Sequence, residues 1–144
     1  MKILLGIAGF FVLCIGLVGW KGYSWWQAHG KAYVAAIKAS AEDGKTFGRT
    51  SDNAACVKSA LDRFSDDTTA VGPVLATGFT QNCLRESKPS PGFCDGVPQP
   101  SERRAVSDWV RTKCDAMATA SSRTCLFALQ AVPRYCHPTE SSNS

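Results

Sequence analysis

Cysteines are the residues of this sequence whose side chains could support the widest range of chemistry. The chain of 144 residues contains seven, and all but Cys14 follow residue 55. Their thiolates could bind zinc, exchange disulfides or form structural bridges. Zinc sites and thiol oxidoreductases commonly use pairs two residues apart, but three gaps between successive cysteines here enclose ten residues each. We therefore expect structural disulfides and no cofactor or metal.

The pairing of the cysteines follows from the helices expected to carry them, because a bridge needs Cα atoms within about 7 Å. An antiparallel helical hairpin would bring Cys114 opposite Cys125. Cys136 would then return to the start of that hairpin, where the loop bearing Cys94 arrives. The predicted bridges are Cys114–Cys125, Cys94–Cys136 and Cys56–Cys83, and the rival set joins Cys83 with Cys94 and Cys56 with Cys136.

Groups suited to catalysis are sparse. His29 and His137 are the only histidines, and neither stands beside a Ser or Cys in a recognisable nucleophile motif. Asp66 and Asp67 precede a helical pattern and are interpreted as helix-capping carboxylates. We therefore predict a protein that is not an enzyme, with a small hydrolase as the alternative from another class.

A Pro-rich loop and the helix after it contain the residues best suited to binding. The loop over residues 87–101 contains four Pro and two Gly, which exclude regular structure. A loop held by a disulfide loses little entropy on binding, although it could equally be a structural connection. The basic helix face could meet an acidic partner or be a solvated surface. The possible partner surface comprises Phe93, Asp95 and Val97 in the loop, and Arg103, Arg104 and Arg111 on the helix.

Helical spacing of apolar residues predicts the elements that position these groups. Ala-rich residues after Lys31 form a stalk helix with Gly44 and Gly48 as possible stops, and a polar linker follows. Asp52 or Asn53 caps the first helix of the domain, and Ser101 caps the third. The four predicted helices cover about residues 53–65, 69–86, 102–117 and 121–132, and Pro133 ends the last. Trp109 is expected in the core, and if exposed it becomes an interface residue.

The N-terminal sequence predicts a membrane segment. Residues 3–20 contain no charge, and as a helix they would extend about 27 Å, close to the thickness of a bilayer core. Four Trp and Tyr side chains stand at the end of this stretch and just after it, and these residue types are enriched at membrane–water interfaces. They are Trp20, Tyr23, Trp25 and Trp26, so residues 3–26 are expected to contact the lipid bilayer. The alternative is a signal peptide cleaved near Gly30.

The complete set of predicted elements is helical, so the chain is expected to be an all-α protein. An N-terminal transmembrane helix with a stalk precedes a small four-helix, disulfide-stapled bundle. The expected regions are a membrane anchor with an aromatic belt (1–30), a helical stalk and linker (31–52), the disulfide-bonded helical domain (53–136) and a disordered tail (137–144).

Composition and cysteine usage restrict location and function. The net charge is +4, with 16 Lys and Arg against 12 Asp and Glu, which is too mild for a nucleic-acid-binding protein. Six cysteines in one small domain favour an oxidising compartment. We expect a single-pass protein of the bacterial inner membrane with its C-terminal domain in the periplasm, or a secreted protein if the signal is cleaved. Its expected function is extracytoplasmic binding or adaptor activity toward a protein partner.

An alternative function is inhibition of an exported enzyme. Over about residues 93–112, a Cys-containing loop runs into a helix, and this stretch is similar to small exported immunity proteins. The likeness implies a periplasmic inhibitor or immunity protein. It is too short to assign a family.

Overall fold

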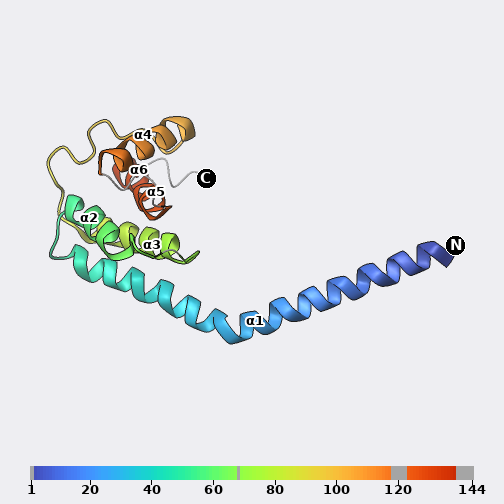
Figure 1. The fold of residues 1–144 in the computed structure, drawn as a ribbon. Coiled ribbons are helices and arrows are strands. Elements are labelled where there is room, and N and C mark those ends of the chain that lie inside the picture. The colour runs from blue at the N-terminus through green and yellow to red at the C-terminus, as the bar shows by residue number, and fades with distance from the viewer. Residues whose placement is uncertain (1, 68, 118–122, 139–144) are drawn as a thin grey trace. The chain divides into compact units, whose positions relative to one another are not determined.

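A computed structural model describes the backbone of residues 2–67, 69–117 and 123–138, and the side chains of residues 2–15 and of Trp25 lie outside the described set. The chain divides into two compact units, Met1–Ala35 and Ala36–Ser144. The described residues form six α-helices and no strand (Figure 1). The all-α prediction is therefore confirmed.

Helix α1 (Lys2–Gly48) supplies the whole of the described first unit. It is continuous through Gly30, where the absence of a side chain leaves room for the Trp26 ring; an added Cβ would lie 2.8 Å from that ring. Large hydrophobic side chains stand exposed along this unit, namely Leu17, Val18, Trp20, Tyr23, Trp26 and Val34. Trp25, predicted to belong to the same aromatic belt, has its side chain outside the described set.

The structure does not support the membrane-spanning helix that the sequence predicts. Across the part of the chain that is described, no helix combines the length and apolar character needed to cross a membrane. The predicted transmembrane helix over residues 3–20 is therefore not supported. The side chains of its residues 3–15 lie outside the described set.

The last turns of α1 pack against α3 (Gly72–Glu86) in the second unit. A Cβ added to Gly44 would stand 3.0 Å from the Cα of Phe79 and closer still to its carbonyl oxygen, and one added to Gly48 would stand 2.5 Å from the carbonyl oxygen of Cys83. The two glycines therefore let the helix backbones meet. Only Gly48 is a helix stop; Gly44 lies inside α1, because close packing outweighs its weak helix propensity.

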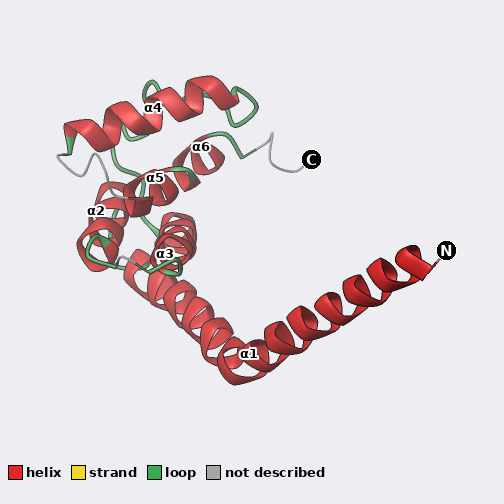
Figure 2. Cartoon of the chain, turned by 45° about the vertical axis from the view of Figure 1, so that its right-hand side comes forward, coloured by secondary structure: helices red, strands yellow, loops and turns green. Residues whose placement is uncertain are grey.

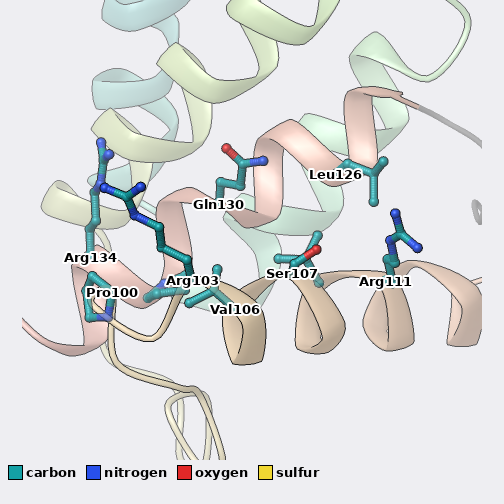
Figure 3. Close-up of a pocket in the computed structure, with 10 residues that line it drawn as sticks. Pro100, Arg103, Val106, Ser107, Arg111, Leu126, Gln130 and Arg134 are labelled. Atoms are coloured by element: carbon teal, nitrogen blue, oxygen red, sulfur yellow. The ribbon is translucent and has the colours of Figure 1, made fainter.

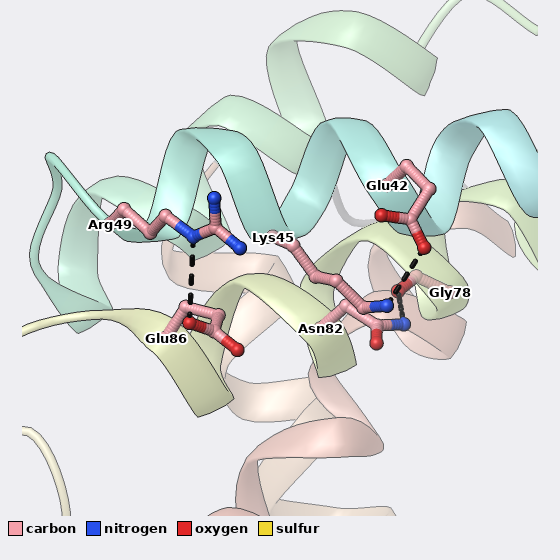
Figure 4. Close-up of polar contacts among 6 residues, drawn as sticks. All are labelled: Glu42, Lys45, Arg49, Gly78, Asn82 and Glu86. Atoms are coloured by element: carbon pink, nitrogen blue, oxygen red, sulfur yellow. Dashed lines mark hydrogen bonds and ion pairs between the residues drawn. The ribbon is translucent and has the colours of Figure 1, made fainter.

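Two polar contacts cross this interface, and Figure 4 draws the one between Arg49 and Glu86. The buried Ser40 hydroxyl donates a hydrogen bond of 2.8 Å to the Leu75 carbonyl. At the far end, Arg49 Nε lies 3.7 Å from a carboxylate oxygen of Glu86. Residues 36–48, expected to form part of a stalk, therefore belong to the compact domain, and the expected linker is helical over residues 45–48.

Helix α2 (Asn53–Phe64) forms where predicted. The Asp52 carboxylate accepts a hydrogen bond of 2.8 Å from the Ala55 amide, which satisfies a free amide of the first turn. Helix α3 begins at Gly72 rather than at Thr69, with Pro73 in its first turn, where a missing amide hydrogen costs nothing.

The C-terminal helices differ in detail from the prediction. Helix α4 (Arg103–Ala116) has Glu102, not Ser101, at its N-cap position. The single helix expected over residues 121–132 is two, α5 (Arg123–Leu129) and α6 (Ala131–Cys136). Pro133 does not end the helical structure, because it lies in the first turn of α6. Backbone N–H groups in a first turn have no intrahelical acceptor, so the N–H that proline lacks is not needed there. Residues 121 and 122, the expected caps, lie outside the described residues.

In the second unit, α5 and α6 lie between α4 and the pair formed by α2 and α3 (Figures 1 and 2). Phe79 is completely buried at the centre, with the Phe47 and Phe64 rings 5.9 and 6.1 Å from its own. The buried Thr124 hydroxyl donates to the Phe64 carbonyl and so ties α5 to α2. The core also contains Cys56, Val57, Ala60, Leu61, Ala76, Cys83, Leu84, Val110, Cys114, Cys125, Ala128, Leu129 and Val132.

Three disulfides join these layers with the predicted pairing, and the rival pairing is absent. Cys56 joins α2 to α3, Cys114 joins α4 to α5, and Cys94 joins the Pro-rich loop to α6. The Cα separations are 5.7 Å for Cys56–Cys83, 6.0 Å for Cys114–Cys125 and 5.5 Å for Cys94–Cys136. The first two bridges are fully buried, whereas Cys94 is exposed.

The expected disordered tail does not begin at residue 137. The His137 ring is half-buried, and its Nε2 donates a hydrogen bond of 3.0 Å to the Val97 carbonyl. This contact fixes the end of α6 to the Pro-rich loop beside the Cys94–Cys136 bridge. Residues 139–144 lie outside the described residues.

Candidate functional site

Helix α4 lies at the surface of the domain and provides most of the candidate site. Only Val110 and Cys114 of this helix are buried. The Cys114–Cys125 bridge ties its last turn to α5. One side of α4 faces α5 and α6, the other faces α2, and a hollow lies along each side. The two hollows differ in charge.

The first hollow is a groove of about 360 Å³ between α4 and the α5–α6 pair, which we call the arginine groove (Figure 3). Val106 and Leu126 supply apolar side chains from opposite sides. Ser107 and Gln130 add polar groups that can donate or accept hydrogen bonds. The complete lining is Pro100, Arg103, Val106, Ser107, Val110, Arg111, Leu126, Gln130, Pro133 and Arg134.

Three cationic side chains line this groove without an acidic neighbour in its wall. Arg103 and Arg134 lie at one end, and Arg111 lies at the other (Figure 3). Within the described residues, none of the three forms an ion pair. Guanidinium groups present several donors in a fixed fork that matches carboxylates and phosphates. The groove can therefore bind an anion.

Two arginines begin α4, next to one end of the arginine groove. Arg103 and Arg104 occupy the first two positions of the helix, and its first turn contains no acidic residue. Cations are unfavourable there, because the amino end of a helix carries partial positive charge. The Glu102 side chain makes no capping bond but accepts a hydrogen bond from the Gln99 amide. Arg103 and Arg104 therefore cost stability at this helix end, where the Glu102 carboxylate at the N-cap position carries the opposite charge.

The second hollow is an apolar groove of about 620 Å³ between α4 and α2. Phe93 reaches it from the Pro-rich loop and packs edge to face on Tyr135, with ring centroids 6.2 Å apart. Trp109 lines it half-buried, with the Lys113 Nζ 5.9 Å from the ring centroid. Trp109 is thus neither fully in the core nor fully exposed. The complete lining is Ala54, Val57, Lys58, Leu61, Asp62, Gly92, Phe93, Trp109, Lys113, Met117, Leu129 and Val132.

The predicted partner surface is divided by the structure. Arg103 and Arg111 line the arginine groove, whereas Arg104 is exposed outside both grooves. Phe93 lines the apolar groove, and Asp95 is exposed in a turn. Val97 does not belong to a partner surface, because its side chain is only 7% exposed and packs in the core.

Of the residues that line the arginine groove, only Arg103 and Arg111 were predicted as site residues from the sequence. Arg134 follows Pro133 and was placed beyond the end of the last helix, and Gln130 was not singled out. Both enter the groove because the chain continues into α6 and turns these residues toward α4. The local signal was the spacing of Gln130 and Arg134, four residues apart, which is one turn of a helix.

The Asp67 carboxylate, one of the groups considered for catalysis, lies outside both grooves. No three His, Cys, Asp or Glu side chains among the described residues come together as metal ligands would. The Asp67 carboxylate accepts hydrogen bonds from the Thr69 hydroxyl and amide, at 2.5 and 2.9 Å. These bonds hold the pKa of Asp67 below its ordinary value, the hydroxyl having the larger effect. Asp67 therefore acts as a turn-forming carboxylate.

Comparisons of the chain with models of protein families, with curated proteins and with solved structures found no match.

Proposed function

We propose that the domain is an extracytoplasmic binding module that receives an anionic part of a protein partner in the arginine groove. The observation that carries this proposal is the convergence of Arg103, Arg111 and Arg134 on one groove whose wall contains no acidic residue. Arg103 and Arg134 share one end of the groove, and an anion that binds between them relieves their mutual repulsion. A partner that brings negative charge therefore gains both attraction and relief of this repulsion.

The frame of the groove supports tight recognition. The Cys114–Cys125 bridge holds α4 against α5, and the Cys94–Cys136 bridge holds the loop that ends at Pro100 against α6. Both walls of the groove are thus anchored by covalent bonds. A site that is already ordered loses less conformational entropy when a ligand binds, and more of the contact energy appears as affinity.

The proposed location is an oxidising compartment outside the cytoplasm, namely the bacterial periplasm. Three disulfides support this placement, because such bonds persist in oxidising compartments. Attachment to the inner membrane through residues 3–26 is part of the proposal. The uncharged sequence 3–20 supports it, as do the exposed apolar side chains of α1 between Leu17 and Trp26, since such patches mark interaction sites.

Affinity capture from native membranes tests the proposed function. The full-length protein, crosslinked in cells, is compared with an R103A/R111A/R134A variant and with an R104A variant. Arg104 is a matched control, because it belongs to the same helix and lies outside the groove. We expect one partner to be recovered with the wild type and with R104A but lost with the triple variant. Equal recovery with all three proteins would exclude the groove as the binding site.

A further inference from the structure

The arginine groove is organised in three parts along its length, and this order defines a ligand. Arg103 and Arg134 form one cationic end, Arg111 forms the other, and Val106 and Leu126 lie between them. Arg103 and Arg111 are eight residues apart on α4, which places their backbones about 12 Å apart at 1.5 Å per residue. In the observed conformations the Arg103 and Arg111 side chains stand at opposite ends of the groove, so a single compact anion bound at one end leaves the other end unoccupied.

The size of the groove favours an extended ligand. Its volume of about 360 Å³ lies at the lower end of the range for ligand pockets. A helix with its side chains is about 10 Å or more in diameter and would rest on the rim. An extended peptide advances about 3.3 Å per residue, so about 12 Å corresponds to four residues. Alternate side chains of an extended peptide point to the same side.

We propose that the arginine groove binds an extended acidic peptide segment with the pattern acidic, any, apolar, any, acidic. The first carboxylate lies between Arg103 and Arg134, and the second meets Arg111. The apolar side chain between them covers Val106 and Leu126. The Gln130 amide, which can donate and accept, is available to the peptide backbone. This ligand class rests on the proposed function, which it makes specific.

The pattern of apolar and charged side chains distinguishes a peptide from a lipid surface. A membrane surface presents many equivalent anionic headgroups, which attract each nearby Lys or Arg by a similar amount. Here the positive groups line a groove and are separated by apolar side chains. Arg104, which is exposed beside the groove on the same helix, is not needed for the peptide. A headgroup layer would use Arg104 as readily as Arg103.

Two labelled peptides of identical composition test the proposal by fluorescence anisotropy with the full-length protein. Acetylated and amidated Glu-Ser-Leu-Ser-Glu has the required spacing, and Glu-Glu-Ser-Leu-Ser does not. We expect the spaced peptide to bind about tenfold more tightly than the clustered one, with affinity falling as salt rises. Removing Arg103 or Arg111 should weaken binding several-fold, whereas R104A should not change it. A second variant, S107E, should also weaken binding by placing a carboxylate inside the groove.

The other outcomes overturn either the proposed ligand or the proposed function, and they distinguish the two. Equal affinity for the two peptides, or displacement of the spaced peptide by millimolar inorganic phosphate, would define an unselective anion site. Binding to vesicles of anionic phospholipid that depends equally on Arg103 and Arg104 would define a lipid surface. If neither peptide binds but the capture of a cellular partner still depends on the three arginines, the binding function stands and the peptide class fails. If the spaced peptide binds but no cellular partner is captured, the peptide class stands and the proposed cellular function fails.

Discussion

Replacing Gly44 with alanine tests the packing of α1 against α3, because propensity and packing predict opposite effects. Alanine is favoured over glycine inside a helix by about 0.8 to 1 kcal/mol. At Gly44, however, the new Cβ would lie 3.0 Å from the Phe79 Cα and closer to the Phe79 carbonyl oxygen. These are backbone atoms of a helix, and they cannot relieve the clash by a rotamer change as a side chain could. The two helices must therefore move apart.

The expected magnitude follows from these two terms. Overpacking a well-filled interface costs about 1 to 3 kcal/mol, and a clash with backbone belongs to the upper part of that range. After subtraction of the propensity gain, G44A should lower the free energy of unfolding by about 1 to 2 kcal/mol. For a domain of this size, about 4 °C of Tm corresponds to each kcal/mol. The expected fall in Tm is therefore about 4 to 8 °C.

Gly78 provides the matched control for the same substitution. It lies inside α3, and an added Cβ there would have no atom within 4 Å. Only the propensity term remains, so G78A should raise the free energy of unfolding by about 0.5 to 1 kcal/mol. Thermal and urea unfolding of the full-length oxidised protein, followed by near-ultraviolet circular dichroism, measures both variants. Stabilisation by G44A similar to that by G78A would refute the close approach of α1 and α3.

Three further predictions concern individual groups of the domain. Under limiting reductant, Cys94–Cys136 should open before the two buried bridges, because Cys94 is exposed; alkylation and mass spectrometry would identify the first thiols, and early release of a buried pair would contradict this order. The buried Asn53 side chain makes hydrogen bonds of 2.7 and 2.8 Å to the segment that follows α3. Asn53→Ala should therefore cost about 2 kcal/mol in urea unfolding, and a loss below about 0.5 kcal/mol would show that these bonds contribute little. The pKa of Asp67 is lowered by accepted hydrogen bonds, so its charged form stabilises the folded state above its unfolded pKa, near 3.8. The difference in stability between wild type and Asp67→Ala should be present at pH 7 and vanish as the pH falls below that value, and a difference that grew in acid would reverse the assigned sign.

The covalent framework could be predicted from the sequence because few helical arrangements satisfy the geometry of a disulfide. The Cys114–Cys125 bridge follows from a local helical hairpin. That bridge placed Cys136 near the loop carrying Cys94, and the remaining pair followed. Local signals also gave the Asp52 cap of α2. These features depend on residues close in sequence or on a strict distance limit.

Features that depend on contacts between distant segments could not be predicted in this way. Gly44 has the sequence signature of a helix stop, and only the approach of α3 explains why α1 continues through it. Pro133 has the signature of a helix end, although a proline is equally suited to the first turn of the next helix. For this reason the sequence alone does not bring Arg134 together with Arg103, and only part of the arginine groove could be predicted.

Site-specific photocrosslinking in cells tests the central claim most directly, because it reports which face of α4 meets the partner. A photoreactive residue is placed at Ser107, which lines the arginine groove, or at Asp108, which is exposed on the same helix and lines neither groove. Binding in the groove predicts one crosslinked protein from position 107 that disappears when Arg103, Arg111 and Arg134 are replaced, and none from position 108. Crosslinks of equal yield from both positions, or a crosslink at 107 that survives the triple replacement, would contradict it.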